Sequence, residues 1–298
     1  MFQPAFAIKA LQKVLYHSDE PVAGLSVVAQ YEMLEMIRKE TDVVVLLSGQ
    51  GADEILLGYL KFFFLHIKSM LARREYAQAL KHLLASFLRG TSVWQFQFSM
   101  ARRYIPSLAN NDLNGSIIHM NPLVPIWEIT DQRSRQIHDI DLFSVPALAH
   151  YEDRNAMAHS LEVRHPFLDH RLVSFALNLP VDLKLKNGWT KYVLRESLPE
   201  LPSAIRWRRD KQGFVIPEKP WLCRELVGDI RAVFERSRLE ELDLLDAQKF
   251  LVYYDDFLAG KPIAFGDISR ALIAEIWARQ FFPVGSGMPE AIREPVTN

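Results

Sequence analysis

One stretch constrains the fold more than any other part of the chain: a β-branched apolar run that breaks into a glycine-spaced loop. Residues 43–47 read Val-Val-Val-Leu-Leu, and residues 48–54 read Ser-Gly-Gln-Gly-Ala-Asp-Glu. The run is too short for a helix and lacks polar alternation, which predicts a strand covered on both faces. Helical spacing resumes at Ile55. A strand, a small-residue turn and a helix in this order are how many α/β proteins hold phosphate.

Length and composition indicate a globular chain. Its 298 residues suit one large domain or two modest ones, burying roughly three quarters of the unfolded surface. Apolar residues make up 49% and charged residues 24%, which is typical of soluble proteins. A net charge of −1 provides no electrostatic attraction to nucleic acid or to an anionic membrane. Cys223 is the only cysteine, which excludes a disulfide framework and a cysteine metal cluster and favours a reducing compartment.

We expect neither a signal peptide nor a membrane span. Residues 1–10 lack a basic region followed by a long apolar stretch. Residues 59–67 are very apolar, but Lys61, His66 and Lys68 interrupt them well short of a span. The expected location is therefore cytoplasmic, with no membrane partner and no nucleic-acid partner.

Most of the remaining chain has helical spacing. The pattern predicts helices or helical regions at 4–17, from 26, 55–67, 72–104 with a break at Gly90-Thr91, 131–158 with a join near Phe143-Ser144, 169–179, 190–198 and after 220, with loops at 110–115 and 206–220. We predict a helix-rich α/β chain in which only residues 43–47 are a confident strand. Because a single strand is not a sheet, either other strands escape detection or part of the sheet lies outside this chain.

The loop itself predicts an anion site. Its small residues let backbone amides approach a ligand, and the free N–H groups that open a helix attract negative charge. Asp53 and Glu54 place carboxylates where such an anion would sit, which is consistent with Mg²⁺ bridging carboxylate and phosphate oxygens. Alternatively, Asp53 caps the helix and Glu54 complements its dipole. The loop lacks a Gly-Lys-Ser/Thr ending, so it is not a Walker A loop.

A second cluster spans residues 160–169, Ser-Leu-Glu-Val-Arg-His-Pro-Phe-Leu-Asp. Proline favours an extended conformation for His165. We expect Asp169 to cap the helix that follows. Glu162 and Arg164 could form a buried ion pair or contact a ligand, and composition does not decide between these roles.

Two further clusters are basic. If Thr190 caps a helix, Lys191 in its first turn opposes the dipole, and Arg195 repels it one turn later. An anion between the two cations would remove both penalties, although a solvated basic face is the plainer interpretation. The run at 206–214, Arg-Trp-Arg-Arg-Asp-Lys-Gln-Gly-Phe, could collect phosphate charge or form a solvated loop. The nine histidines show no zinc-ligand spacing, so we interpret most of them as surface or satisfied core residues.

Taken in order, these clusters resemble the synthetase half of the glutamine-dependent asparagine synthetase family. The resemblance covers about residues 15–222. Its matching pieces are Glu20-Pro21, the loop at 48–54, Gly58-Tyr59, 160–171, 188–195 and 211–214. Any one piece is weak, whereas the ordered set is specific.

The resemblance implies an ATP pyrophosphatase fold, the adenine-nucleotide α-hydrolase type of parallel sheet. It also implies a reaction in which a side-chain carboxylate of aspartate attacks the α-phosphate of ATP, pyrophosphate leaves, and ammonia attacks the acyl-adenylate. A metal and cations must neutralise the departing pyrophosphate. By position, Asp53 matches the family's Mg²⁺-pyrophosphate aspartate, and Lys191 matches the lysine that holds phosphate charge through adenylation.

The same resemblance assigns the other site residues. Ser48 and Gly49 match the pair that contacts the nucleotide, and we add Gly51 and Arg195 as nucleotide-binding residues. Gln50 occupies a catalytic position often filled by Asp or Glu. A neutral amide can orient a substrate but cannot act as a general base. Relatives that activate other carboxylates, as in β-lactam or lasso-peptide cyclisation, are therefore the alternative to asparagine formation.

Two other departures concern what the chain lacks relative to this family. The Ser-Gly-Gly-x-Asp-Ser loop, the main pyrophosphate cradle, should lie several tens of residues before Ser48 and is absent from the sequence. Residue 2 is Phe2 rather than the nucleophilic cysteine of the glutaminase domain, and Cys223 lies in the wrong half. We therefore expect an N-terminally truncated sheet, with the missing half or a glutaminase chain supplied separately or lost at the gene start.

These observations lead to one partial domain over residues 1–298. We expect 1–70 to hold the remnant of the sheet with its loop, 71–282 to be helical, and 283–298 to be a disordered tail. The expected ligands are ATP, Mg²⁺, aspartate or another carboxylate, and ammonia. A hypothesis of a different class is a non-catalytic remnant that binds a partner. In every case the truncated sheet should leave an exposed apolar surface near 43–47.

Overall fold

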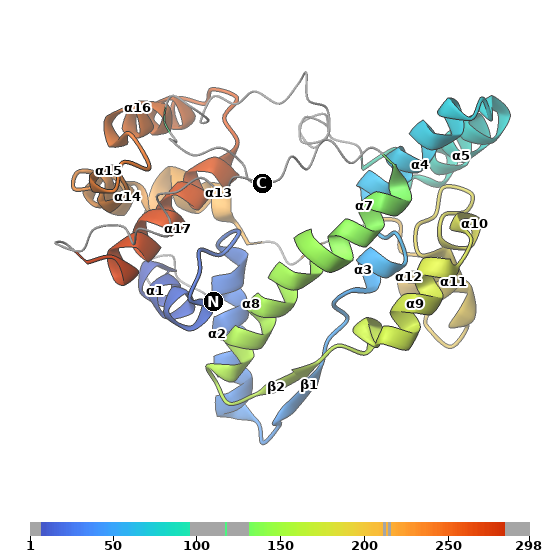
Figure 1. Cartoon of the computed structure of the whole chain (residues 1–298), viewed down its shortest axis with the longest axis horizontal. Coiled ribbons are helices and arrows are strands. Elements are labelled where there is room, and N and C mark those ends of the chain that lie inside the picture. Colours follow the sequence, from blue (N-terminus) through green and yellow to red (C-terminus); the bar gives the residue numbers. More distant parts are fainter. Residues whose placement is uncertain (1–6, 96–116, 118–130, 211–212, 214–215, 284–298) are drawn as a thin grey trace, which may run out of the picture.

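The computed structural model describes residues 7–95, 117, 131–210, 213 and 216–283, and this part of the chain is mostly helical (Figure 1). Its elements in chain order are α1 (Ala7–Ser18), α2 (Ser26–Glu40), β1 (Val45–Leu47), α3 (Ala52–Ile55), α4 (Leu60–Ala72), α5 (Tyr76–Arg89), α7 (Gln132–His138), α8 (Val145–Met157), β2 (Glu162–Arg164), α9 (His170–Asn178), α10 (Val181–Lys184), α11 (Tyr192–Ser197), α12 (Ser203–Arg206), α13 (Glu218–Pro220), α14 (Val227–Phe234), α15 (Arg238–Glu241), α16 (Ala247–Leu258) and α17 (Phe265–Phe281). The described part is thus an α/β structure with little sheet, in agreement with the helix-rich prediction.

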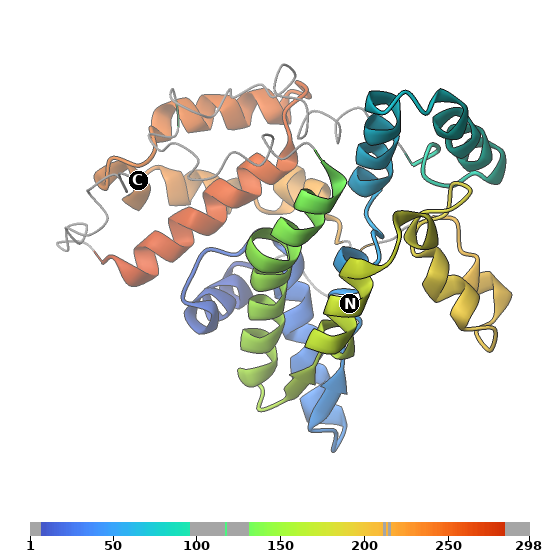
Figure 2. The ribbon, with the colours of Figure 1, turned by 45° about the vertical axis from the view of Figure 1, so that its right-hand side comes forward.

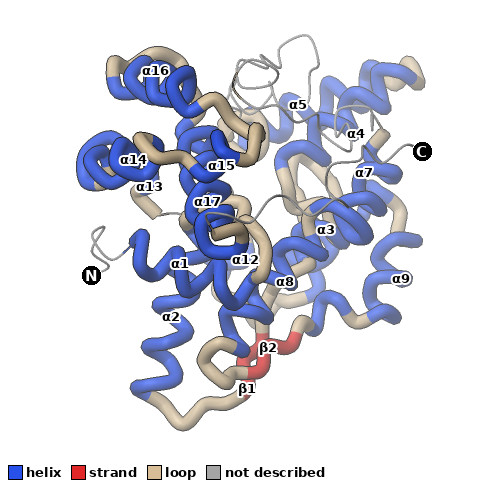
Figure 3. The backbone as a smooth tube through the Cα atoms, turned by 60° about the vertical axis from the view of Figure 1, so that its left-hand side comes forward, coloured by secondary structure: helices blue, strands red, loops and turns tan. Residues whose placement is uncertain are grey.

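The two strands form one small parallel sheet at an end of the molecule (Figure 3). Val45 pairs with Glu162 and Leu47 with Arg164. The sequence predicted β1 but not β2. Three residues with a charged group at each end carry no strand pattern, so β2 can be recognised only from its pairing with β1.

The prediction that β1 is covered on both faces is wrong for the described residues. Val44 is 54% exposed and Leu47 is 75% exposed. Only Leu46 packs inward, against the small cluster formed by Leu34, Ala156 and Leu161. The expected apolar surface at this edge is therefore present.

The main hydrophobic core lies away from the sheet, where α1, α2 and α8 meet the C-terminal helices. Helical spacing places Leu11, Val14 and Leu15 on one face of α1, and all three are fully buried. They belong to the same buried cluster as Phe250 of α16 and Leu272 of α17. This cluster makes the α1–α2 and α13–α17 side of the molecule the densely packed one (Figure 1).

The other side of the molecule is built from small clusters. Ile55 of α3 packs with Ala176 of α9, and Phe63 of α4 packs with Ala79 of α5. Figure 2 shows the α4–α5 hairpin beside the segment that contains α9 to α12. The loop after β1 enters this side of the molecule.

Several predicted helix boundaries are confirmed. α2 begins at Ser26, and α5 ends at Arg89 with Gly90 as its left-handed C-cap (φ 64°). The predicted join near Phe143-Ser144 is a π-helical turn over Asp139–Phe143. Residues 1–6, 96–104, 110–115 and 284–298, including nearly all of the predicted tail, lie outside the described residues.

The single helix predicted after the loop is wrong, because α3 ends at Ile55 and α4 begins at Leu60. Leu57 between them has a left-handed φ of 56°, which a continuous helix does not allow. The segment Ala52–Ala72 is nevertheless long enough and apolar enough to cross a membrane, judged by length and composition alone. Half of that segment's most apolar window is buried inside the described structure.

Candidate active site

Ser48 fixes the start of the loop at the end of the sheet. Its backbone N–H donates to the carbonyl of Arg164 at 2.9 Å, which continues the ladder one residue beyond β1. Its hydroxyl donates to Glu152 Oε2 at 3.0 Å and accepts the backbone N–H of Gln50 at 3.2 Å. The chain therefore turns immediately after the strand, and the glycines that follow lie in the bend.

Gly51 is required by both conformation and space. Its φ is 91°, and a Cβ atom there would lie 2.2 Å from a methyl carbon of Leu168. Gly51 is the N-cap of α3, so Asp53 lies inside the first turn. The alternative prediction that Asp53 caps this helix is therefore wrong.

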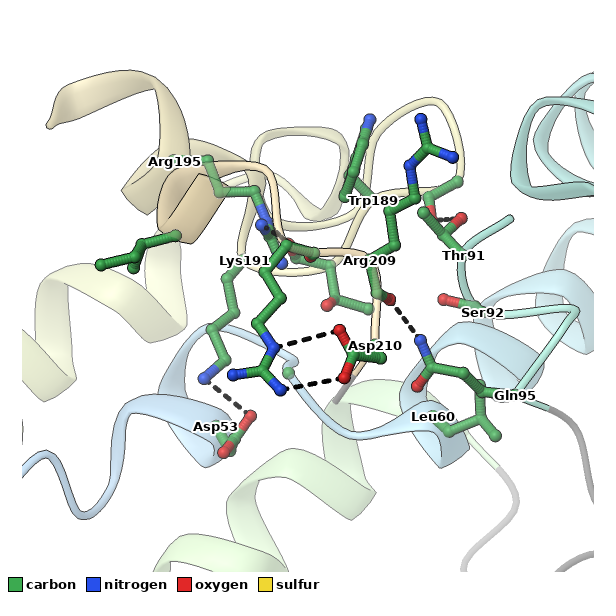
Figure 4. Close-up of a pocket in the computed structure, with 15 residues that line it drawn as sticks. Asp53, Leu60, Thr91, Ser92, Gln95, Trp189, Lys191, Arg195, Arg209 and Asp210 are labelled. Atoms are coloured by element: carbon green, nitrogen blue, oxygen red, sulfur yellow. Dashed lines mark hydrogen bonds and ion pairs between the residues drawn. The ribbon is translucent and has the colours of Figure 1, made fainter. Parts of the chain in front are cut away.

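Asp53 pairs with Lys191 instead. The carboxylate Oδ1 and the ammonium Nζ are 2.9 Å apart, and about a quarter of each side chain remains exposed. The two side chains point toward one another at the edge of a cavity (Figure 4). The negative charge that lies beside Lys191 is thus the Asp53 carboxylate of the protein itself.

Lys191 occupies an unusual backbone position. It is the N-cap of α11 and has a left-handed φ of 51°. The prediction that Thr190 caps this helix is wrong. A lysine with positive φ is uncommon, and strained backbone of this kind clusters at functional sites.

Gly58 brings the two charged side chains together. A Cβ atom at this position would lie 1.8 Å from Asp53 Oδ1 and 2.4 Å from Lys191 Cε. No side chain other than hydrogen leaves room for both groups. The sequence identified Gly58 only as part of the family resemblance, without this role.

Glu54 faces the protein interior rather than a ligand. It is fully buried and accepts the hydroxyls of Tyr59 at 2.7 Å and Ser144 at 2.6 Å. Burial and then the charge of Glu54 raise the pKa of Tyr59 well above its usual value. The expectation that Glu54 places charge at an anion site is therefore wrong, and this residue anchors α3 to the start of α8.

Asp53 and Lys191 line one cavity of about 250 Å³. Its wall combines polar, aromatic and charged groups from segments far apart in the chain. The lining residues are Asp53, Gly58, Leu60, Thr91, Ser92, Gln95, Gly188, Trp189, Thr190, Lys191, Arg195, Ile205, Arg208, Arg209 and Asp210.

Arg195 forms part of this wall. Its Nε donates to the carbonyl of Thr190 at 2.9 Å, and its guanidinium lies 4.9 Å from the ring centroid of Trp189. It also donates to the carbonyls of Arg206 and Arg208. Burial lowers its pKa below the usual arginine value. Arg195 therefore holds two loops together at the cavity, and its nucleotide-binding role stays a prediction.

The basic run at 206–214 forms ion pairs. Arg208 binds Asp210 through two hydrogen bonds of 3.0 and 2.9 Å, and Arg206 pairs with Glu196 at 3.1 Å. Both pairs are largely exposed at their acidic partners, as expected of a solvated loop. Lys211, Gln212 and Phe214 lie outside the described residues.

The structure separates the predicted site residues into two groups. Asp53, Lys191 and Arg195 lie together at the cavity. Among the described residues that line it, none comes from 48–51, which stays at the end of the sheet. There, Glu152 Oε2 lies 3.6 Å from His165 Nδ1 as well as near Ser48.

Sequence reasoning missed Thr91 and Ser92 as cavity residues. Both are buried, and the Thr91 hydroxyl donates to the carbonyl of Gly188 at 2.8 Å. The break at Gly90-Thr91 was visible as a helix end, but a helix end does not reveal which cavity it borders.

The second cluster has mainly structural roles. Asp169 caps α9 by accepting the N–H of Arg171 at 2.9 Å, which confirms the predicted cap. The side chain and backbone of Arg171 hold the pKa of that carboxyl well below its usual value. Glu162 and Arg164 pair at 2.7 Å, but each side chain is more than half exposed, which excludes the alternative of a buried ion pair.

Comparison with known proteins identifies the family. The asparagine synthase family matches residues 1–279. Asparagine synthetase (glutamine-hydrolysing) 1 of Bacillus subtilis strain 168 is 25% identical over 93% of this chain and 46% of its own length. The putative asparagine synthetase (glutamine-hydrolysing) of Mycobacterium bovis is 30% identical over 72% of this chain and 36% of its own length. The asparagine synthetase (glutamine-hydrolysing) of Gallus gallus is 26% identical over 74% of this chain and 30% of its own length.

The chain spans less than half the length of these relatives. The family match begins at residue 1 and ends at residue 279, so it includes the loop after β1, Asp53, Lys191 and most of the C-terminal helices. The chain belongs to the asparagine synthase family and corresponds to its C-terminal synthetase domain.

Proposed function

We propose that this chain is the C-terminal portion of an ATP-dependent amide-forming ligase that activates aspartate as an acyl-adenylate and amidates it with ammonia. The observation that carries the proposal is the Asp53–Lys191 pair at the edge of a polar cavity. A carboxylate is a poor acyl donor until one oxygen becomes part of a good leaving group. Pyrophosphate must leave for this to happen, and its negative charge requires cations.

The chemistry of Asp53 fits Mg²⁺. This ion prefers hard oxygen ligands and is usually held by one or two carboxylates together with substrate phosphates. The Asp53 carboxylate is partly exposed, and the absence of a side chain at Gly58 keeps space beside it. When bound there, Mg²⁺ would neutralise charge on the pyrophosphate oxygens.

Lys191 would exchange partners when substrate binds. In the absence of substrate, its ammonium is neutralised by Asp53 at 2.9 Å. With Mg²⁺ and pyrophosphate bound, Asp53 would hold the metal and Lys191 would bind a phosphate oxygen, so each group would gain a new opposite charge. Lys191 lies at the N-cap of α11 in a left-handed conformation, so no turn of that helix precedes it, and its side chain points toward Asp53. Lys191 would then hold phosphate charge while the bond between the α- and β-phosphates breaks.

The proposed reaction has the two steps of other acyl-adenylate reactions. An aspartate side-chain oxygen forms a bond to the α-phosphorus as the bond to pyrophosphate breaks. The ammonia nitrogen then bonds to the acyl carbon, AMP leaves with the carboxylate oxygen, and a proton goes to solvent. Gln50 has an amide side chain and would orient a substrate rather than take this proton. Ser48, Gly49 and Gly51 would contact the nucleotide from the sheet end.

A second segment of protein would complete this site. The 298 residues contain no Ser-Gly-Gly-x-Asp-Ser sequence. The edge strand β1 leaves Val44, Val45 and Leu47 exposed, which is an unfavourable arrangement for an isolated sheet edge. We propose that a segment carrying the phosphate loop, in the same polypeptide or another, adds strands beside β1.

The alternative product is a cyclised or otherwise amidated carboxylate. Gln50 favours this alternative, because the position lacks an acidic side chain. The same Asp53–Lys191 pair would serve any acyl-adenylation, so the two functions differ in the carboxylate bound rather than in how phosphate is handled.

Product analysis tests the proposal. The chain, combined with the segment that carries the phosphate loop, is incubated with ATP, Mg²⁺, aspartate and ¹⁵N-ammonia, and products are separated by mass spectrometry. We expect ¹⁵N-asparagine and AMP in equal amounts. AMP released only with a different carboxylate would support the alternative, and release of ADP instead of AMP would contradict adenylation altogether.

A further inference from the structure

Three metal-ligating side chains converge outside the candidate active site. His66 comes from α4, His82 from α5 and Asp182 from α10. One potential ligand atom from each residue lies within 4.8 Å of those from the other two. The two imidazole rings are 5.5 Å apart and nearly perpendicular, at 79°.

Both histidines carry buried nitrogens without a protein partner. His66 is only 5% exposed, and neither its Nε2 nor His82 Nδ1 has a hydrogen-bond partner among the described residues. A buried polar atom without a partner is unfavourable, because it loses its hydrogen bonds to water without a replacement. These two histidines are therefore exceptions to the sequence-based interpretation of most histidines as surface or satisfied core residues. Their positions on separate helices hid the cluster, because no short spacing links them.

Burial favours the neutral form of both imidazoles, because it lowers the pKa of His66 to about 4 and also lowers the pKa of His82. A neutral imidazole has one ring nitrogen whose lone pair can bind a metal. Asp182 is exposed and can supply one carboxylate oxygen at the solvent side of the cluster.

We propose that His66, His82 and Asp182 bind one divalent transition-metal ion of the zinc class, with water as the fourth ligand. Two imidazoles and a carboxylate form a common zinc ligand set. Zn–N and Zn–O bonds of about 2.0–2.2 Å place tetrahedral ligands roughly 3.4 Å apart. The 4.8 Å limit of this set is somewhat wider, so the ion would draw the exposed Asp182 side chain inward.

The ion would join the α4–α5 hairpin to the segment that leads to Lys191. α5 already contacts that segment at its far end, where Arg89 donates to the Asn187 carbonyl at 2.6 Å and Thr91 donates to that of Gly188. A Cβ atom at Gly188 would lie 2.5 Å from the backbone of Ser86, so the two segments are in close contact. Metal bound between α4, α5 and α10 would therefore hold both walls of the cavity in place, without taking part in the reaction.

Zinc binding to the untagged full chain, stripped of metal with a chelator, tests this proposal. Zn²⁺ is titrated against a chromogenic competitor, and Co²⁺ is added separately to record its visible spectrum. We expect one tight equivalent of Zn²⁺, an intense tetrahedral Co²⁺ band, and a higher melting temperature with Zn²⁺. His82→Gln and Asp182→Asn should each weaken Zn²⁺ binding by about 10–100-fold or more, since even the loss of a hydrogen-bond partner to a ligand has an effect of this size.

His170→Gln is the matched control, because His170 is exposed at the start of α9 and lies outside the cluster. It should leave the tight equivalent unchanged. Circular dichroism of each metal-free variant separates lost binding from lost folding, and the exposed Asp182 makes its variant the safest for folding. Equal Zn²⁺ affinity in the wild type, His82→Gln and Asp182→Asn would overturn the proposal, as would the absence of a tight equivalent in the folded wild type.

Discussion

At the scale of single residues, the ion pair between Asp53 and Lys191 is the main feature of the candidate site. Asp53 and Lys191 neutralise each other in the free chain, and both keep about a quarter of their side-chain surface exposed. An exposed ion pair contributes little to stability, typically about 0–1 kcal/mol. The strained φ at Lys191 and the required glycine at position 58 are therefore poorly explained by stability alone.

We predict that Asp53→Ala and Lys191→Ala each reduce aspartate-dependent ATP–pyrophosphate exchange by about 10²–10³ in the completed enzyme, as for loss of one charge-stabilising group. The exposed pair formed by Asp256 and Lys261, 2.8 Å apart, is the matched control. Asp256→Ala and Lys261→Ala should leave exchange unchanged. Wild-type exchange in either site variant would show that this pair does not handle pyrophosphate.

Gly58→Ala should impair the candidate site without disrupting the fold. The added methyl group would displace the Asp53 carboxylate and the Lys191 stem, both of which end in flexible groups. We therefore expect exchange to fall by at least about tenfold, as a small misplacement of reacting groups does elsewhere, while the far-ultraviolet circular dichroism spectrum is retained. Gly228→Ala, where nothing lies within 4 Å of the added Cβ, is the control. An unchanged exchange rate in Gly58→Ala would contradict the close approach seen here.

Much of this site could be proposed from residues, but its geometry could not. Asp53 and Lys191 were each singled out by local charge and by resemblance, and the structure places them in contact. Their contact depends on how α3 and α11 pack, which no local pattern encodes. The prediction for Glu54 is wrong for the same reason. A carboxylate in the first turn of a helix can face a ligand or the protein interior, and the Glu54 side chain is fully buried in the interior.

At the scale of elements, buried polar groups tie α3, α7 and α10 together. The Gln136 side chain of α7 donates to the carbonyl of Ile55 at 2.8 Å, and its Oε1 accepts from Lys184 Nζ at 3.3 Å. Lys184 also donates to the Ala176 carbonyl at 2.8 Å and is 1% exposed. This network fixes the helix that carries Asp53 relative to the segment that leads to Lys191.

Burial lowers the pKa of Lys184 from 10.5 to about 8, which gives a pH dependence of known sign. Between these values the unfolded chain binds more protons than the folded chain, so the free energy of unfolding contributed by Lys184 rises as pH increases. Relative to Lys184→Met, the wild type should become more stable from pH 8 to 10.5 in urea unfolding. The exposed Lys186→Met serves as control, and a parallel pH profile for wild type and Lys184→Met would contradict a buried, perturbed lysine.

The exposed strand β1 is the element that a completing segment should cover. Leu47 is 75% exposed, so Leu47→Glu should leave the fold intact and make the isolated chain less prone to self-association. The same change should weaken association with the segment that carries the phosphate loop. Sedimentation velocity measures both effects. A wild-type chain that is already monodisperse and monomeric, and binds that segment no better than the variant, would contradict this role for β1.

Strand prediction shows why the sheet could be foreseen only in part. The β-branched run at 43–47 predicts β1 from sequence alone, whereas its exposure depends on which segments pack beside it and is not encoded in the run itself. β2 carries Glu162 and Arg164 on its exposed side, so it looks like loop until it is paired with β1. The strongly amphipathic spacing of α1 predicts a helix close to its observed position, and the predicted start of α2 at Ser26 is also confirmed.

At the scale of the whole molecule, packing is unevenly distributed. The largest buried cluster among the described residues joins α1, α2 and α8 to the C-terminal helices, while the cavity side rests on several small clusters. The chain spans less than half of its relatives, and its best-packed region lies away from the site. This distribution suits a domain whose site is completed by further protein.

Aspartate-dependent ATP–pyrophosphate exchange tests this account most directly. It is measured on the chain alone, on the segment that carries the Ser-Gly-Gly-x-Asp-Ser loop alone, and on the two combined. We predict exchange only in the combination, because one phosphate loop and the Asp53–Lys191 pair must meet on the same nucleotide. Robust exchange by the chain alone would contradict the claim that it supplies only part of the site.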